Sequence, residues 1–414
     1  MFSALRYRLY PDEDTRERLG STLALCCYLY NESLAERKRR YKETGHGLYY
    51  NEQANALPAF KKENPAFTDV HSQVLQNVLK RLERSFKNFF DGRAGYPKPK
   101  NESKWRSLTY PQASPSWVRR NSIVLPKIGK VRVVKQRPVK GEVKTVTVLR
   151  TSVEEWYAVI TVKRSNTDQK KEPKTAVGID LGLTDYAHLS DGTRVENPRF
   201  IMQHDKRIVK AQRILSRRVK GSRNRWRARV TLSRRWDDYT NQKDDWQWKL
   251  AHSIVDRFDI IGYENLQVNN MVKNHRLAKA IQDASWSGFT QRLTDVAVMA
   301  GSLAVGVDPR YSTQECPECG SRIRMALSER THICPSCGFR GQRDFASSLV
   351  IRKRALEALG LGMPEVTPME MGPTPAAMTA MGEPCRGSGK QIPTPPTKAL
   401  DGLDSGAGSL PLKG

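Results

Sequence analysis

Four cysteines stand in two closely spaced pairs within the segment CPECGSRIRMALSERTHICPSCG. Cys316 and Cys319 form the first C-x2-C pair, fourteen residues follow, and Cys334 and Cys337 form the second pair. Each pair can place two thiolates on one side of a tight turn, and a glycine follows each pair, where such a turn needs a permissive backbone. Two such turns complete a tetrahedral site, and four thiolates leave no open position, so the spacing predicts one structural zinc ion. The alternatives are a redox-active dithiol pair and coincidence.

Three acidic residues occupy positions that suit a metal site built from oxygen ligands. Asp180 ends the apolar run AVGI, Glu264 ends the run IIGY, and Asp344 begins an expected helix in GQRDFASSLVIRK. Buried carboxylates repel one another, so a cluster of them needs cations, typically Mg²⁺ or Mn²⁺. Two such ions about 4 Å apart can activate water and stabilise the leaving oxygen in phosphodiester hydrolysis. Taken singly, the acids could be a turn former, a strand-end residue and a helix N-cap, and spacing alone does not show that they converge.

The overall charge indicates a polyanionic partner. The chain has 414 residues with a net charge of +27, which favours nucleic acid over the alternative of a basic membrane-surface protein. No apolar run approaches the roughly 20 residues of a membrane helix, and no signal peptide opens the chain, so a cytoplasmic protein of a bacterium or archaeon is expected. Residues 206–235 contain thirteen Lys and Arg and no acid. Phosphate contact through Arg217, Arg218 and Lys220 is expected there, and a solvated helix face is the alternative.

The pattern of apolar residues predicts the elements that must position these groups. Residues 3–10 alternate like a strand, 12–46 and 70–90 have helical periodicity, and 105–162 contain short β runs typical of a small barrel or sandwich. The segment from residue 175 is mixed α/β, with a helix that leads into the strand before Glu264. From Leu361 onward the chain is rich in Pro and Gly and lacks aromatic residues, so this tail is expected to be disordered and dispensable.

Several of these motifs occur together in one order. GIDLGLTDYAHLSDG, DIIGYENLQVNNM, the cysteine pairs and RDFASSLVIR follow one another in a chain that opens with RLYP, YNESLA and GLYY. This order resembles the TnpB family of transposon-encoded RNA-guided nucleases, relatives of the small type V CRISPR effectors. The resemblance covers residues 1–360 and is firm over residues 175–352.

The resemblance implies an α/β multidomain fold, with a RuvC/RNase H-like domain, an inserted zinc ribbon, and an N-terminal β-barrel that carries a helical recognition insertion. The implied divisions are residues 1–11 for the first barrel strand, 12–100 for the recognition domain, 101–173 for the rest of the barrel, 174–312 for the nuclease domain, 313–340 for the zinc ribbon, 341–360 for the last nuclease segment and 361–414 for the tail.

The resemblance also implies an activity and its partners. Asp180, Glu264 and Asp344 would be the catalytic acids of an RNA-guided DNA endonuclease, with a transposon-end-derived guide RNA, a double-stranded DNA target beside a short adjacent motif, and no small-molecule substrate. Tyr50, Gln76 and Asn77 match positions near the surface that reads the adjacent motif, although helix packing is an alternative for the last two.

The chain departs from the family pattern after the cysteine pairs. It reads Gln342-Arg343-Asp344 and then Ala346-Ser347-Ser348, where the family usually has acid-basic-acid and then Asn-Ala-Ala. The catalytic acid is retained, so the departure bears on turnover rate. A non-cleaving RNA-guided repressor and a zinc-ribbon nucleic-acid-binding factor without a guide remain as alternatives.

Overall fold

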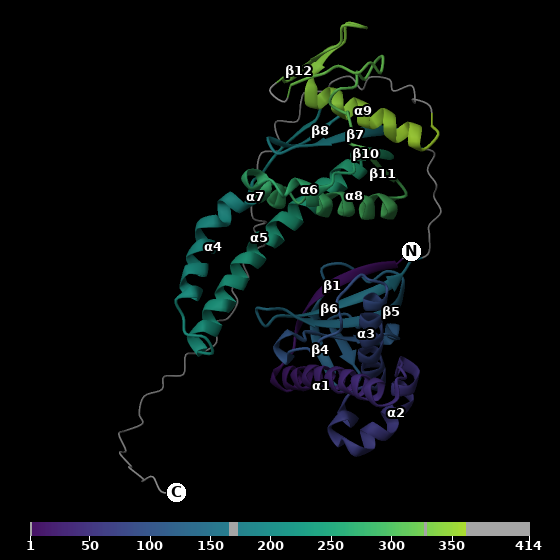
Figure 1. The fold of residues 1–414 in the computed structure, drawn as a ribbon, viewed down its shortest axis with the longest axis vertical. Helices are drawn as coiled ribbons and strands as arrows, with labels where there is room; N and C mark the ends of the chain where they lie inside the picture. The colour runs from purple at the N-terminus through teal and green to yellow at the C-terminus, as the bar shows by residue number, and fades with distance from the viewer. Residues whose placement is uncertain (1, 165–172, 327–328, 362–414) are drawn as a thin grey trace.

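The computed structural model describes residues 2–164, 173–326 and 329–361. Figure 1 shows an N-terminal sheet flanked by helices α1 to α3, and a second sheet enclosed by helices from the rest of the chain. The tail expected to be disordered, residues 361–414, lies outside the described residues except for Leu361. Among the helices of the described part, none is both long enough and apolar enough to cross a membrane.

The N-terminal sheet has six antiparallel strands. Their order is β2 (Ser107–Tyr110), β5 (Glu142–Arg150), β6 (Trp156–Lys163), β1 (Phe2–Tyr10), β4 (Gly129–Val134) and β3 (Ser122–Leu125). Alternate residues of β4 and β6 are buried, as in a sheet with one covered face, which confirms the strands expected from the β runs. The pairing links the strands in a row with β2 and β3 at its ends, and the Tyr110 hydroxyl donates to the Pro126 carbonyl at 3.1 Å between those ends. Closure into a barrel stays an expectation.

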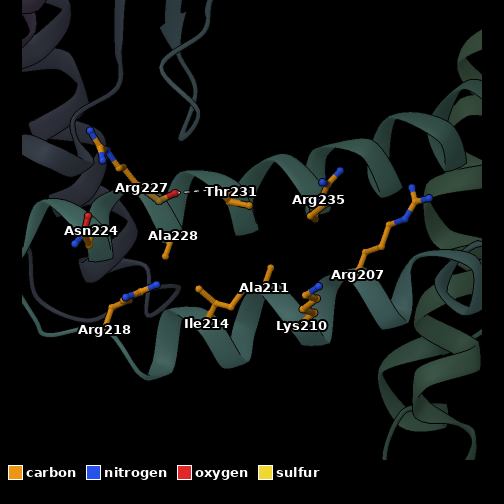
Figure 2. Close-up of a pocket in the computed structure, with 10 residues that line it drawn as sticks. All are labelled: Arg207, Lys210, Ala211, Ile214, Arg218, Asn224, Arg227, Ala228, Thr231 and Arg235. Carbon is orange, nitrogen blue, oxygen red and sulfur yellow. Dashed lines mark hydrogen bonds between the residues drawn. The ribbon is translucent and has the colours of Figure 1, made fainter.

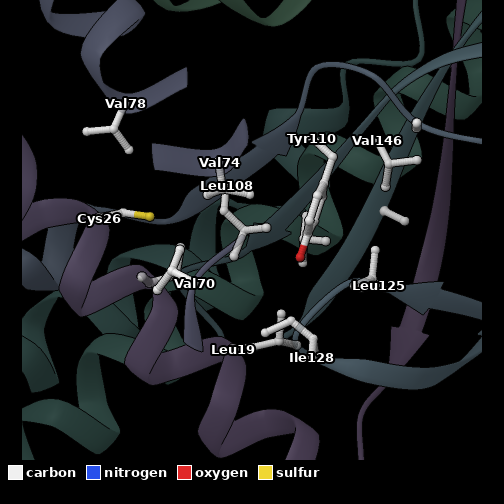
Figure 3. Close-up of a cluster of buried hydrophobic side chains, with 14 of the residues drawn as sticks. Leu19, Cys26, Val70, Val74, Val78, Leu108, Tyr110, Leu125, Ile128 and Val146 are labelled. Atoms are coloured by element: carbon white, nitrogen blue, oxygen red, sulfur yellow. The ribbon is translucent and has the colours of Figure 1, made fainter. Parts of the chain in front are cut away.

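Three helices cover this sheet and share its core. They are α1 (Glu13–Thr44), α2 (Tyr50–Glu63) and α3 (Ser72–Phe90), and the two expected helical segments, residues 12–46 and 70–90, are confirmed. Asp12 caps α1 by accepting from the Thr15 N–H at 2.9 Å, and Gly45 ends it with a φ of 69°. Figure 3 shows Leu19 and Cys26 of α1 with Val74 and Val78 of α3 beside strand residues of the same core. The helical insertion is therefore packed onto the sheet as one hydrophobic unit.

The second sheet has five strands in mixed directions. Their order is β11 (Leu303–Val307), β10 (Ile260–Glu264), β7 (Ala176–Leu181), β8 (Asp185–Leu189) and β9 (Arg194–Glu196). β10 runs parallel to β7 and β11, whereas β8 runs antiparallel to β7 and β9. Helices α5 (Arg223–Val255) and α8 (Trp286–Ala300) lie on one side of the sheet and α9 (Arg343–Ala358) on the other (Figure 1). The expected helix and the strand that ends at Glu264 are confirmed.

The basic segment forms a helical hairpin. The structure divides residues 206–235 between α4 (Phe200–Ser216) and α5, because the chain turns at Gly221 with a φ of 87°. α4 and α5 pack against each other along the segment (Figure 2).

The remaining elements are short. They are helices α6 (Val268–Met271) and α7 (His275–Ala284), the two-stranded ribbon β12 (Thr331–Ile333) and β13 (Arg340–Gln342), and the 3₁₀ turns η1 (Pro65–Asp69), η2 (Glu102–Lys104) and η3 (Pro115–Trp117).

Candidate active site and metal centre

Two glycines let α9 lie close against the second sheet. Gly178 of β7 and Gly262 of β10 are direct partners in the parallel pair. A Cβ atom at Gly178 would lie 2.0 Å from the Ser348 carbonyl oxygen, and a Cβ at Gly262 would lie 2.7 Å from the Ala355 Cβ. Neither position therefore accepts a side chain. This close approach holds the first turn of α9, which carries Asp344, beside the strands that carry the other two acids.

The three predicted acids lie at one end of this sheet, where β7 and β10 finish and α9 begins. Asp180 is the fifth residue of β7, and Glu264 ends β10 one residue beyond the paired Ile179 and Tyr263. Burial raises the pKa of Asp180 well above its ordinary value, and the negative charges of Glu264 and Asp344 raise it further. The structure therefore brings Glu264 and Asp344 each within electrostatic reach of Asp180, which sequence spacing could not show.

Glu264 is held by a neighbour that the sequence did not single out. The Ser312 hydroxyl donates to the Glu264 carboxylate at 2.5 Å. Burial raises the pKa of Glu264, while this hydrogen bond and the charge of Arg354 oppose the rise. Ser312 lies in the loop after β11 and is itself buried. No local pattern marks such a serine, since its role depends on a contact between segments far apart in the chain.

Two arginines and a histidine lie near Asp344. The Arg343 Nε lies 3.2 Å from the Asp344 carboxylate, and Arg330 and His188 have nitrogen atoms 4.0 and 3.9 Å from it. The His188 Nε2 also lies 3.0 Å from a carboxylate oxygen of Asp185. The two arginines place positive charge beside the Asp344 carboxylate.

Asp185 is a fourth acid close to this end of the sheet. It is buried on β8, and besides His188 it pairs with the Arg194 Nε at 2.7 Å. His188 is the direct partner of Asp180 in the β7–β8 ladder. Sequence reasoning missed Asp185 and His188, although the motif GIDLGLTDYAHLSDG contains both. The sequence shows only an acid and a histidine three residues apart in an expected strand, and this spacing does not distinguish a site from an ordinary buried pair.

The four predicted cysteines come together as a compact centre. The four Sγ atoms all lie within 4.8 Å of one another, and among the described residues this is the one group of potential metal ligands so tightly gathered. The Cys316 and Cys337 Sγ atoms are 3.5 Å apart, as are those of Cys319 and Cys334. The centre could hold a metal ion with four sulfur ligands. Asp180, Glu264 and Asp344 do not form a group this tight.

The two cysteine turns have the same backbone geometry. The Gly320 N–H donates to the Cys316 carbonyl at 3.0 Å, and the Gly338 N–H donates to the Cys334 carbonyl at 2.9 Å. Both glycines have positive φ, 76° and 81°, so the expected need for a permissive backbone is confirmed. Hydrogen bonds with the side chain and backbone of Ser321 lower the pKa of the Cys319 thiol to about 6. At Cys337 the effect is opposite: a hydrogen bond with the Phe339 backbone lowers the pKa, but burial and hydrogen bonds with the other cysteines raise it to about 12. The case for a metal centre therefore rests on the close approach of the four sulfur atoms.

The predicted basic contacts lie at the turn of the α4–α5 hairpin. Arg217, Arg218 and Lys220 are all exposed. A groove of about 570 Å³ runs between the two helices (Figure 2) and is lined by residues that include Arg207, Lys210, Arg218, Arg227 and Arg235. Of the thirteen basic residues at 206–235, all of which the structure describes, Arg235 forms an ion pair, at 3.5 Å with Asp238. The hairpin is therefore a positively charged surface with few counter-charges of its own.

The three residues expected near the motif-reading surface lie in different surroundings. Tyr50 is half-buried at the start of α2, with the Lys80 ammonium 5.5 Å from its ring centre. Gln76 is exposed on α3. Asn77 accepts a hydrogen bond from the Arg81 Nε at 3.1 Å, and Arg81 in turn donates to the Ser107 carbonyl. Asn77 thus has a structural contact of its own.

Three family models match the chain. A probable transposase family matches residues 158–275, a Cas12f1-like TNB domain matches residues 286–351, and a helix-turn-helix domain matches residues 1–46. The first two together span the carboxylates on β7 and β10, the cysteine centre and Asp344. The third covers β1 and one uninterrupted helix, α1.

Curated relatives match most of the chain. A putative RNA-guided DNA endonuclease of Streptomyces pristinaespiralis is 32% identical over 369 residues, covering 87% of this chain and 90% of the relative. The putative RNA-guided DNA endonuclease InsQ of Escherichia coli (strain K12) is 28% identical, covering 90% and 97%. The solved structure of the mini-RNA-guided endonuclease CRISPR-Cas_phi3 aligns with a TM-score of 0.45 at 9% identity, covering 86% of this chain and 92% of that one. The family models and the near full-length relatives agree, and the chain belongs to the TnpB family of transposon-encoded RNA-guided nucleases.

Proposed function

We propose that the chain is an RNA-guided DNA endonuclease that hydrolyses phosphodiester bonds at Asp180, Glu264 and Asp344. The observation that carries this proposal is the meeting of three carboxylates, from β7, β10 and α9, at one end of the second sheet, where burial and then the charges of the other two acids raise the pKa of Asp180. Such a group is unstable without cations, and hard divalent ions with oxygen ligands compensate it.

The donor set fits two Mg²⁺ or Mn²⁺ ions. Asp180, Glu264 and Asp344 would hold them, and the ions would supply activation of water and stabilisation of the leaving oxygen. The remaining residues would support this arrangement. Ser312 fixes the orientation of Glu264 through its 2.5 Å hydrogen bond. Arg330 and Arg343 place positive charge beside Asp344, where it would attract the scissile phosphate.

The positive surface would hold the nucleic acids. The groove between α4 and α5, with Arg217, Arg218 and Lys220 at its turn, would contact phosphates of the guide RNA or of its duplex with the DNA target. Tyr50, Gln76 and Asn77 remain candidates for contacts near the adjacent motif. The domain divisions implied by the family stay part of this proposal, including a barrel formed by closure of the N-terminal sheet.

The cysteine centre would hold one structural zinc ion. Its two turns are short and contribute few apolar residues, so the ion would supply much of the free energy that orders the ribbon. Since α9 and Asp344 follow directly after β13, an ordered ribbon would also help to place the third acid.

The decisive test compares cleavage and binding on the same variants. The protein is purified with the RNA that accompanies it, that RNA is sequenced, and cleavage of a matching DNA is measured with and without Mg²⁺. Wild type is expected to cleave only with the divalent ion, whereas Asp180→Asn, Glu264→Gln and Asp344→Asn are expected to lose cleavage and retain DNA binding. A triple variant should be little worse than a single one, because the three acids act as one unit.

The two alternatives give different results in this test. A wild type that binds the matching DNA but does not cleave it indicates an RNA-guided repressor. Absence of any defined RNA indicates a nucleic-acid-binding factor without a guide. If Asp344→Asn cleaves at the wild-type rate and the other two single variants do not, the segment Gln342–Ser348 does not supply the third ligand.

A further inference from the structure

A pocket rich in aromatic rings lies away from both sites, between the C-terminal halves of α1 and α3. It has a volume of about 710 Å³, and the loop after α1 and Tyr96 complete its walls. Four of its rings are exposed: Phe90 by 76%, Tyr41 by 65%, Tyr49 by 62% and Tyr96 by 43%. Large apolar rings gathered at one exposed place are typical of a binding surface.

The rings form an ordered group. Phe86 and Tyr96 meet edge to face with ring centres 5.7 Å apart, and Phe89 and Tyr96 do so at 5.2 Å. Phe86 and Phe90 are stacked at 6.3 Å. This cluster fixes the wall through ring contacts, and the outer faces of Tyr41, Tyr49 and Phe90 are left for a flat ligand.

A buried guanidinium lines the same pocket. Arg37 is only 6% exposed, its Nη1 donates to the Glu83 carboxylate at 2.7 Å, and its Nε donates to the Gln53 side-chain oxygen at 2.8 Å. Its Nη2 is buried and has no hydrogen-bond partner among the described residues. A buried donor without an acceptor is costly, so this atom points to an acceptor that a ligand would bring.

The composition of the pocket selects the ligand. Glu83 compensates the charge of Arg37, so the buried donor suits a neutral acceptor, such as the ring carbonyl or ring nitrogen of a nucleobase, better than a phosphate. Cationic side chains stand at the rim, where a sugar-phosphate chain would leave. Lys87 lines the pocket, and the Lys38 ammonium lies 5.3 Å from the Tyr96 ring centre. Base stacking on aromatic rings with basic residues beside them is the usual mode for unpaired nucleotides.

We propose that this pocket binds an unpaired nucleobase of the RNA that the protein carries. The base would stack on the exposed rings and accept a hydrogen bond from the Arg37 guanidinium. We assign the base to RNA because a folded RNA presents unpaired bases in loops before any target is bound, whereas DNA presents them only after guide pairing has opened the target. This inference rests on the proposed RNA-guided function only for the presence of RNA, and it does not require cleavage.

The experiment measures RNA binding and crosslinking in the full-length protein with its copurified RNA. Ultraviolet crosslinking with mass spectrometry is expected to join RNA to peptides that carry Tyr41, Tyr49 or Phe90. The double variant Tyr41→Ala, Phe90→Ala removes exposed rings and should weaken binding of that RNA about tenfold, as expected for one lost base stack. The slope of log K against log salt should not change, because no phosphate contact is lost.

A control and a second site variant separate this binding mode from others. The control, Tyr28→Ala, removes a ring that is 54% exposed elsewhere on α1 and should leave RNA affinity unchanged. The site variant, Arg37→Lys, keeps a positive charge beside Glu83 but removes the unpaired Nη2 donor, so RNA affinity should fall, and its thermal midpoint is measured to show that the protein is folded. Unchanged affinity in the double variant together with absent crosslinks would overturn the proposal, as would crosslinks to DNA or to a copurified protein at these peptides. If the wild-type protein does not cleave DNA but gives the expected RNA crosslinks, the proposed endonuclease activity is contradicted and the pocket assignment remains.

Discussion

Gly178 and Gly262 face each other across the parallel strands β7 and β10, and α9 lies directly over both of them. The Ser348 carbonyl oxygen stands 2.0 Å from where a Gly178 Cβ would be, and the backbone nitrogen of Arg352 stands 2.4 Å from it. Backbone atoms of a buried helix cannot move aside as the end of a flexible side chain can. The distance between α9 and the sheet, and with it the position of Asp344, therefore depends on these two glycines.

Gly178→Ala is expected to destabilise the packing of α9 on the second sheet by about 1–3 kcal/mol, the range for overpacking a well-packed interior. It should also displace α9 and abolish cleavage while RNA binding to the N-terminal part persists. Thermal unfolding and cleavage assays check this. Gly20→Ala is the matched control, because a Cβ at Gly20 of α1 meets nothing within 4 Å. If Gly178→Ala cleaves DNA at the wild-type rate, the close packing of α9 on the sheet is not needed for cleavage.

Asp180→Asn is expected to stabilise the protein when divalent ions are absent. Burial and the neighbouring acids raise the pKa of Asp180 in the folded state, so Asp180 binds its proton more tightly in the folded protein than in the unfolded chain. Metal-free stability therefore falls as pH rises from the ordinary carboxyl range through this raised value. The neutral amide removes that loss, so the thermal midpoint at neutral pH should rise by about 2–4 °C per kcal/mol gained.

The stabilisation has a clear control. Asp185 is also buried, but it is paired with Arg194 and His188, so Asp185→Asn should lower the thermal midpoint. Scanning calorimetry of both variants with chelator and with Mg²⁺ checks the pair of expectations. A lower midpoint of Asp180→Asn in chelator would contradict the electrostatic strain inferred at this end of the sheet.

Cys316→Ser is expected to release zinc and disorder the ribbon, because each thiolate supplies one of four ligands. Elemental analysis should give one zinc per wild-type chain and a reduced amount in the variant, with lower cleavage. Cys26→Ser provides the comparison. Cys26 is a fully buried cysteine of α1 in the N-terminal core, so its replacement should cost stability without changing zinc content. Active, zinc-free wild-type protein would rule out the structural ion.

Reversal of Arg217, Arg218 and Lys220 to Glu is expected to weaken binding of nucleic acid and to flatten its salt dependence by roughly one unit of slope for each lost phosphate contact. The control replaces the two arginines with lysine, which keeps the charge and should keep the slope. Arg225 is left intact, because its guanidinium donates to the carbonyls of Leu215 and Arg218 and holds the turn together. Titrations at several salt concentrations decide the matter, and an unchanged slope would indicate a merely solvated surface.

The sequence by itself determined the features that local geometry controls. The cysteine turns follow from C-x2-C pairs and the glycines after them, since a turn of a few residues depends on its own backbone. The helices at residues 13–44 and 72–90 and the strands from Ser122 to Lys163 follow from apolar periodicity and end signals. The order of motifs indicated the family, because that order is more specific than any one of the motifs.

The tertiary structure alone decided which of these features meet. Asp180, Glu264 and Asp344 come from separate elements, and their approach depends on parallel pairing of β7 with β10 and on α9 packed over glycines. Ser312 and His188 gain their contacts with Glu264 and Asp344 in the same way, and no pattern along the chain encodes contacts between distant segments. The pocket at Arg37 is a further case. Whether the buried Nη2 of Arg37 has a hydrogen-bond acceptor depends on which distant residues the fold places around it.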